Sequence, residues 1–165
     1  MSVSYRFERD LGILYVRYEG HHHTLHTKDL LARYIRDKNV TPGLHSVLDF
    51  SRILSAELDV AMRITVMNRL YSLLKHPDKE WKVTYFCPTE VSRSLTSMQQ
   101  KMWLTRKGVD FYVAETVETL AIRVGQDLDL VKAMVNHGDM AVTDATRKTR
   151  KKGLPLLGAL SRFNI

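Results

Sequence analysis

Cysteine is nearly absent from this chain, and its scarcity excludes a disulfide framework. The chain has 165 residues, of which Cys87 is the only cysteine. A single thiol has no partner for an internal disulfide, which fits a protein of a reducing compartment. A chain of this length does not need such a bond, because it can bury roughly 70% of the surface that its unfolded form exposes. We therefore expect one domain with a self-sufficient core.

Long apolar runs are missing as well. No stretch of the sequence approaches the roughly 20 apolar residues that a membrane-spanning helix requires. Arg6, Glu8, Arg9 and Asp10 interrupt any apolar run in the N-terminal region, so we expect no secretory signal peptide. We therefore expect a soluble, cytoplasmic protein.

Signature motifs of common enzymes are absent too. The sequence has no glycine-rich phosphate-binding loop, no Gly-x-Ser-x-Gly and no His-Glu-x-x-His, which are patterns that position phosphates, nucleophiles or zinc. Nothing in the sequence pairs Cys87 with a base, so its thiol is expected to behave as a small buried hydrophobe. No other acid/base pair stands out, and we expect neither enzymatic activity nor a cofactor.

Basic residues are in excess, but the excess lies near the C terminus. The formal net charge is +7. Residues 147–165 carry six basic side chains and no acidic one, which leaves residues 1–146 at about +1. A nucleic-acid-binding domain usually presents its basic residues across a folded face. The nearly neutral body therefore argues against a specific nucleic-acid site.

Hydrophobic periodicity predicts an α/β fold. Residues 3–8 and 13–19 alternate between apolar and polar side chains around the turn residues 9–12, as in an antiparallel hairpin. Strand and helix patterns then alternate, which favours right-handed βαβ crossovers and a mixed, mostly parallel sheet with helices packed on it. The expected strands are 45–50, 81–87 and 109–113. The first expected helix follows Thr24 or Thr27 as its N-cap, and the others begin near 56, 89, 117 and 128. We expect the domain to cover residues 1–138 and a tail to cover 139–165.

Two of the helices carry apolar stripes that predict their core-facing residues. In the helix over about 56–75 the stripes are Val60/Ile64/Met67/Tyr71/Leu74 and Met62/Val66/Leu70/Leu73, and in the helix after Thr89 the stripe is Val91/Leu95/Met98/Met102. The first of these helices is apolar over more of its circumference than one core-facing stripe needs. This predicts deep burial or contact with a second subunit, and we expect a homodimer.

Three segments carry a family resemblance over about residues 1–125. They are Tyr18-Glu19-Gly20, Val47-Leu48-Asp49-Phe50-Ser51, and the strand–helix junction from Phe111 to Leu120. Together with the order β-β-α-β-α-β-α-β-α, they resemble the SpoIIAA-like branch of the STAS superfamily, the fold of the sporulation anti-sigma-factor antagonists. The resemblance implies a non-enzymatic regulatory domain that acts through a protein partner. A related branch of the fold binds lipids, so a carrier for a small apolar or lipid ligand, held under the sheet or at its rim, is the alternative function. A cavity under the sheet lined by Met62, Val66, Met98 and Met102 would favour it.

Some members of that family are switched by phosphorylation of a serine just after the third strand. Here Asp49-Phe50-Ser51 matches the start of the family's motif, and the continuation reads Leu54-Ser55-Ala56-Glu57, which keeps one serine and loses its neighbouring Asp, Ser and Gly. The resemblance implies Ser55, and with less support Ser51, as the phosphorylated position. From the residues alone, Ser55 is more readily explained as the N-cap of the next helix.

The carboxyl ends of the strands bring a second set of candidates to one edge of the sheet, where open α/β sheets bind ligands. These rim candidates are His21, His22, His23, Asp49, Cys87 and Glu115. His22 and His26 are also four residues apart, a spacing at which two imidazoles can bind zinc or copper. No carboxylate in that run provides a third ligand, so we expect no metal. A small enzyme that uses Ser51, Ser55, His22 or His23 at this rim is the third function considered.

The tail combines a basic cluster with an apolar helical face. Its basic cluster is Arg147, Lys148, Arg150, Lys151 and Lys152, and its apolar face is Leu156, Leu157, Leu160 and Phe163, after Pro155. Such a segment suits an anionic membrane surface or the groove of an acidic partner, and its charges give salt-sensitive, non-specific affinity for nucleic acid. Packing of the tail on its own domain, or across a dimer, is the other interpretation.

Overall fold

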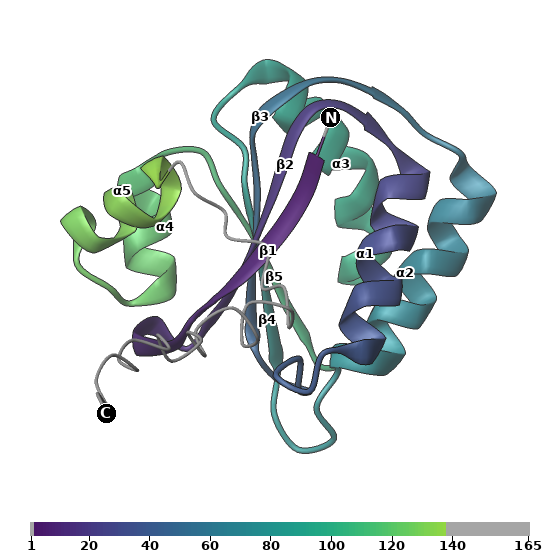
Figure 1. Cartoon of the computed structure of the whole chain (residues 1–165), viewed down its shortest axis with the longest axis horizontal. Helices are drawn as coiled ribbons and strands as arrows, with labels where there is room; N and C mark the ends of the chain where they lie inside the picture. The colour runs from purple at the N-terminus through teal and green to yellow at the C-terminus, as the bar shows by residue number, and fades with distance from the viewer. Residues whose placement is uncertain (1, 138–165) are drawn as a thin grey trace, which may run out of the picture.

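The computed structural model describes residues 2–137 as a mixed sheet with helices on both faces (Figure 1). The strands are β1 (Ser2–Glu8), β2 (Ile13–His23), β3 (His45–Glu57), β4 (Trp81–Phe86) and β5 (Val109–Ala114). The helices are α1 (Thr24–Arg36), α2 (Val60–Leu74), α3 (Glu90–Leu104), α4 (Val117–Val124) and α5 (Leu128–Asn136). The tail predicted over 139–165, with its basic cluster, lies outside the described residues.

The strands follow one another across the sheet in chain order, β1-β2-β3-β4-β5. β1 pairs antiparallel with β2, and the later pairs are parallel. The hairpin turn consists of the 3-10 turn η1 (Arg9–Leu11) and Gly12, whose φ of 65° lies in the left-handed region that glycine adopts without strain. The predicted α/β class, hairpin and mostly parallel sheet are confirmed.

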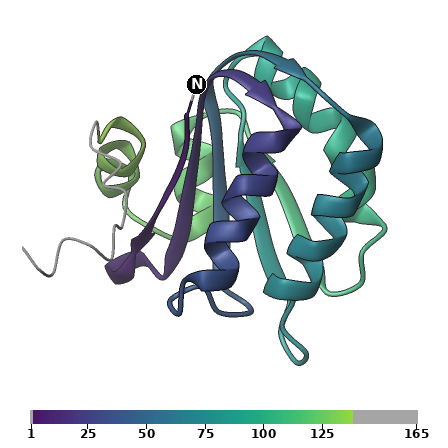
Figure 2. The ribbon, with the colours of Figure 1, turned by 45° about the vertical axis from the view of Figure 1, so that its right-hand side comes forward.

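Three successive crossovers place α1, α2 and α3 on one face of the sheet. Each crossover joins two neighbouring parallel strands, and all three progress along the sheet in the same direction. Right-handed crossovers in this order place their helices on the same face of the sheet. Figures 1 and 2 show these helices on one side of the sheet and α4 and α5 on the other. The sheet therefore has a large apolar core under α1–α3 and a smaller one under α4 and α5. No helix within residues 2–137 is both long and apolar enough to cross a membrane.

β2 and β3 continue past β4 as a two-stranded parallel ribbon, which comprises residues 19–23 and 52–57. β3 pairs with β4 only from Ser46 to Asp49, whereas its pairing with β2 continues as far as His23 and Glu57. The sequence patterns predicted both strands too short. The ribbon residues lack the period-2 alternation of apolar and polar side chains that is typical of a strand. Both strands continue through them because the two backbones pair.

The N-caps of α1 and α2 differ from the predicted ones. The imidazole of His23 accepts a hydrogen bond from the Leu25 amide at 3.1 Å and caps α1, so neither Thr24 nor Thr27 does. The carboxylate of Asp59 accepts from the Met62 amide at 2.9 Å and caps α2. Ser55 lies inside β3, and its interpretation as an N-cap is wrong.

The buried face of α3 is largely polar, which contradicts the predicted face. Its inward residues are Ser92, Thr96, Gln99 and Trp103, whereas Val91 and Met98 are 39% and 53% exposed. Ser92 forms a capping box with Thr89, and the Thr96 hydroxyl contacts the Cys87 thiol at 2.9 Å. Each inward residue follows a residue of the predicted apolar stripe by one position. These contacts and the large Trp103 ring favour the observed face.

The buried face of α2 contains an arginine. The side chains that it turns toward the core are Arg63, Val66, Met67, Leu70 and Leu74. Val60 and Ile64, which the predicted stripe placed in the core, are 60% and 45% exposed. The prediction followed hydrophobicity alone and therefore had no place for a buried guanidinium.

Candidate functional site

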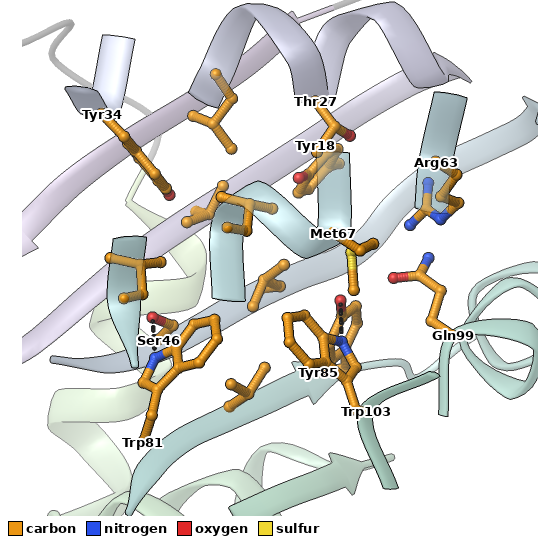
Figure 3. Close-up of a pocket in the computed structure, with 16 residues that line it drawn as sticks. Tyr18, Thr27, Tyr34, Ser46, Arg63, Met67, Trp81, Tyr85, Gln99 and Trp103 are labelled. Atoms are coloured by element: carbon orange, nitrogen blue, oxygen red, sulfur yellow. Dashed lines mark hydrogen bonds between the residues drawn. The ribbon is translucent and has the colours of Figure 1, made fainter. Parts of the chain in front are cut away.

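A narrow cavity, here called the slot, runs through the larger core between the sheet and helices α1, α2 and α3. About 20 Å³ of it is open to the centres of water molecules. A single water needs roughly 10–15 Å³ of such space. The slot is therefore a thin gap, and Figure 3 shows side chains converging on it from the strands and the three helices.

Aromatic side chains form much of the slot's wall. Trp81 and Trp103, the only two tryptophans of the chain, pack edge to face with 5.2 Å between their ring centroids. The indole N–H of Trp81 donates to the Ser46 hydroxyl at 3.1 Å, and that of Trp103 donates to the Tyr85 hydroxyl at 3.0 Å. With these polar atoms bonded, the rings offer apolar surface. The aliphatic part of the wall consists of Val16, Leu30, Leu48, Met67, Leu70, Leu74 and Val83.

Two buried polar side chains close one end of the slot. Arg63 is 7% exposed and Gln99 is 1% exposed, and Figure 3 shows the two pointing toward one another. Within the described residues, Nε of Arg63 and Oε1 of Gln99 have no hydrogen-bond partner. None of the ion pairs formed within residues 2–137 includes Arg63. This guanidinium is an exception, since buried charges in proteins are normally paired.

His22 contacts the guanidinium of Arg63 but carries no negative charge that would balance it. The Nε2 atom of His22 lies 3.3 Å from Nη1 of Arg63. Burial of the imidazole, and next the Arg63 charge, lower the pKa of His22 to about 3, so the ring is neutral near neutral pH. A neutral ring that accepts at Nε2 carries its proton on Nδ1, and this atom has no partner among residues 2–137.

Of the hydroxyl groups that border the slot, those of Tyr18 and Thr27 come from residues drawn near Arg63 in Figure 3. Burial raises the pKa of Tyr18, so its phenol keeps its proton and can donate a hydrogen bond. The guanidinium of Arg63, the Gln99 amide and these hydroxyls give this end more donors than acceptors. The arrangement can therefore bind an acceptor-rich or anionic group.

The three consecutive histidines of the predicted rim lie in three different environments. His21 is exposed, and its Nδ1 contacts the hydroxyl of Ser55 on the neighbouring ribbon strand. His22 is buried beside Arg63, and His23 caps α1. The rings of His22 and His26 are 6.2 Å apart between centroids. No group of three or more His, Cys, Asp or Glu side chains in the described part of the chain could hold a metal ion.

The other rim candidates do not join the histidines in one site. Asp49 is fully buried on the opposite side of the sheet from the slot, where it accepts from the Tyr15 hydroxyl and from the Ser51 amide. The Cys87 thiol is buried against Thr96. Glu115 is a surface residue, and its Oε2 lies 3.8 Å from Nη1 of Arg93. Ser55 contacts His21, and the hydrogen bonds within the described residues that involve His22 and His23 lead to Arg63 and to the start of α1.

Comparison with known proteins adds no family to this geometry. No protein-family model matches the chain, and no curated protein matches it. Membership of the STAS superfamily therefore stays a prediction from the sequence. A function has to be argued from the site itself.

Arg63 and Gln99 were not among the predicted site residues. A signal for Arg63 is present in the sequence, because it falls in phase with Val66, Leu70 and Leu74, which are apolar residues of the buried face. A charged residue in phase with an apolar stripe predicts either a snorkelling side chain or a buried charge. Gln99 has no such signal, because the whole inward face of α3 is polar up to Trp103.

Proposed function

We propose that this chain is a non-catalytic binding domain that holds a small apolar molecule in the slot between its sheet and helices α1–α3. The observation that carries the proposal is the slot itself, an aromatic and aliphatic passage that ends at unpaired polar atoms. Protein interiors are otherwise packed as densely as organic crystals. Ligand sites are mostly apolar, with a few polar groups that fix the ligand's orientation.

Binding requires the slot to widen, because the space open to water centres is about 20 Å³. Met67 is the side chain suited to this movement. It projects into the middle of the slot in Figure 3, and an unbranched thioether has three rotatable bonds with which to repack around a guest. The expected ligand is therefore slender and of modest size.

Tryptophan fluorescence tests the proposal directly, because both tryptophans line the slot. Titration with 1-octanol is expected to give a saturable change in emission. Met67→Phe, which replaces a flexible side chain by a rigid ring, should weaken binding at least tenfold if the slot is the site. Met134→Phe is the matched control, because Met134 is also 4% exposed but lies in the smaller core.

Two results would contradict this function. One is the absence of any saturable response to 1-octanol in the wild-type protein. The other is equal weakening by Met67→Phe and Met134→Phe, which would place the response outside the slot. Circular dichroism melts of both variants establish that each is folded before the titrations are compared.

A second candidate is the regulatory role implied by the family resemblance, with a second copy of the chain as the protein partner. The ribbon favours it, because beyond Asp49 the outer edge of β3 has no β4 partner and Leu54 there is 76% exposed. Open strand edges pair with other strands.

Leu54→Lys is then expected to convert a dimer to a monomer in sedimentation velocity, and Ser55→Glu tests a phosphorylation switch in the same assay. A wild-type chain that is monomeric throughout would contradict this role.

A further inference from the structure

We infer that the ligand of the slot is a monocarboxylate with an apolar tail, such as a medium-chain fatty acid, and that Arg63 binds its carboxylate. The inference rests on the proposed function, since it names the ligand class of the same slot. The structure assigns the head group to the end of the slot bordered by Arg63 and Gln99 and the tail to the end bordered by Trp81.

The unbalanced charge is the first step of the argument. Arg63 is 7% exposed, belongs to none of the ion pairs within residues 2–137, and has His22 as a neutral acceptor. A guanidinium stays protonated in proteins, so it cannot escape burial by losing its proton as a lysine can. A buried charge without a partner is costly. An anionic ligand would supply the missing counter-charge.

The direction of the donors is the second step. In Figure 3 the guanidinium of Arg63 and the amide of Gln99 face one another across the end of the slot, with the amide nitrogen toward Arg63. An acceptor placed between two donor groups that face one another can bond to both. A carboxylate offers two oxygens in the planar geometry that a guanidinium binds best.

The lining of the remaining slot selects the rest of the ligand. Beyond its polar end the wall consists of tryptophan, tyrosine, leucine, valine and methionine side chains and of Ser46. The hydroxyl of Ser46 and that of Tyr85 accept hydrogen bonds from the two indole N–H groups. Such a wall favours an uncharged tail. One guanidinium balances one negative charge, which favours a monoanion over a phosphate monoester. The thinness of the gap favours a single unbranched chain.

Water in the slot is the competing explanation. The space open to water centres, about 20 Å³, is enough for one water molecule. A water could accept from Nε of Arg63 and donate to Oε1 of Gln99, the two atoms that lack partners. It would satisfy the hydrogen bonds but would leave the charge unbalanced, and it would give the slot no preference for a carboxylate.

The test compares octanoate with 1-octanol, which have the same chain length and differ in the head group. Tryptophan fluorescence and calorimetry of the wild-type protein should show octanoate binding about 10- to 100-fold more tightly, as expected for a hydrogen-bonded charge. Arg63→Met should abolish this preference and retain 1-octanol binding. Arg63→Lys should restore part of it, because a lysine keeps the charge and loses the bidentate geometry.

Two controls make the comparison specific. Arg123→Met removes a partly buried arginine that pairs with Asp110 on the other face of the sheet, and it should leave octanoate binding unchanged. Gln99→Leu, which keeps the volume of α3's inward face, should weaken octanoate more than 1-octanol. Excess inorganic phosphate should not displace octanoate, and displacement would overturn the assignment to a monocarboxylate.

The outcomes separate the inference from the function on which it rests. Equal affinity of the wild-type protein for octanoate and 1-octanol, or an unchanged preference in Arg63→Met, would overturn the carboxylate assignment and leave the apolar binding function standing. If neither molecule binds, the proposed function itself is contradicted. If Arg63→Met does not fold, the wild-type preference and the Gln99→Leu titration decide the matter.

Discussion

Arg17 and Asp49 form an ion pair in which neither side chain is exposed to solvent. Nε of Arg17 lies 3.7 Å from Oδ2 of Asp49, and both side chains are 0% exposed. The same guanidinium donates to the carbonyl oxygens of Val135 and His137 at 2.7 and 2.8 Å. The pair thus joins the middle of the sheet to the C-terminal end of α5, where free carbonyl groups favour a cation.

Removal of one partner from this pair is expected to be costly. Arg17→Met leaves the Asp49 carboxylate buried without its counter-charge and should lower the free energy of unfolding by about 3–5 kcal/mol, measured by urea denaturation. Replacement of both partners, in Arg17→Met/Asp49→Leu, should recover much of that loss, because a buried pair can often be exchanged for apolar residues at little cost. Equal losses in the single and double variants would show that the carbonyl contacts to α5 dominate.

The neutral state of His22 predicts acid destabilisation. Burial lowers its pKa to about 3, so below about pH 6.5 the unfolded chain takes up a proton at this residue and the folded chain does not. The free energy of unfolding should therefore fall as the pH falls from about 6.5 toward 3, by about 1.4 kcal/mol per pH unit for this group. Urea denaturation at a series of pH values measures the slope.

His22→Gln is the matching variant, because an amide can still accept the hydrogen bond from Arg63 but does not titrate. A shallower slope is expected, with a remainder due to His45, whose pKa burial lowers to about 4. The double variant His22→Gln/His45→Gln should remove both contributions above about pH 4.5. An unchanged slope in His22→Gln would mean that its imidazole is as free to protonate in the folded state as in the unfolded one.

The sequence predicted the sheet better than it predicted the helices. Val3, Tyr5 and Phe7 alternate with polar neighbours, and this period specifies a strand with one buried face whatever the rest of the fold does. The ribbon at the ends of β2 and β3 was missed, because its stability comes from pairing between the two backbones and leaves no clear pattern in the side chains.

The polar end of the slot could not be predicted, because it depends on contacts between distant segments. Hydrophobicity placed Val91 and Met98 in the core, whereas the contact of Thr96 with Cys87 turns Gln99 inward. Arg63 meets His22 from a different part of the chain, and no local pattern encodes that meeting. A site was therefore expected at the strand-end rim or, for an apolar ligand, under the sheet. The slot lies under the sheet, but none of the residues predicted to line a cavity there, Met62, Val66, Met98 and Met102, lines it.

Cys87 is expected to be unreactive in the folded protein. Burial raises the pKa of its thiol to about 11, and its sulfur lies 2.9 Å from the Thr96 hydroxyl. At about pH 8 a thiol of that pKa is ionised in about one molecule in a thousand. Labelling by iodoacetamide should therefore be slow in buffer and fast in urea, as read by mass spectrometry. Labelling in buffer at the rate of a free thiol would show that the strand end after β4 is open.

The slot also predicts opposite effects of one substitution on stability and binding. Leu74→Ala removes a side chain that lines the slot and should destabilise the protein by about 2–5 kcal/mol, while the added space should strengthen binding of 1-octanol. Leu120→Ala is the matched control: Leu120 is as deeply buried as Leu74, at 0% and 2% exposure, but lies in the smaller core under α4 and α5. It should lose stability to a similar extent without any gain in affinity. If both variants bind 1-octanol more tightly, general loosening of the fold explains the gain, because a specific cavity can be enlarged only by a residue that borders it.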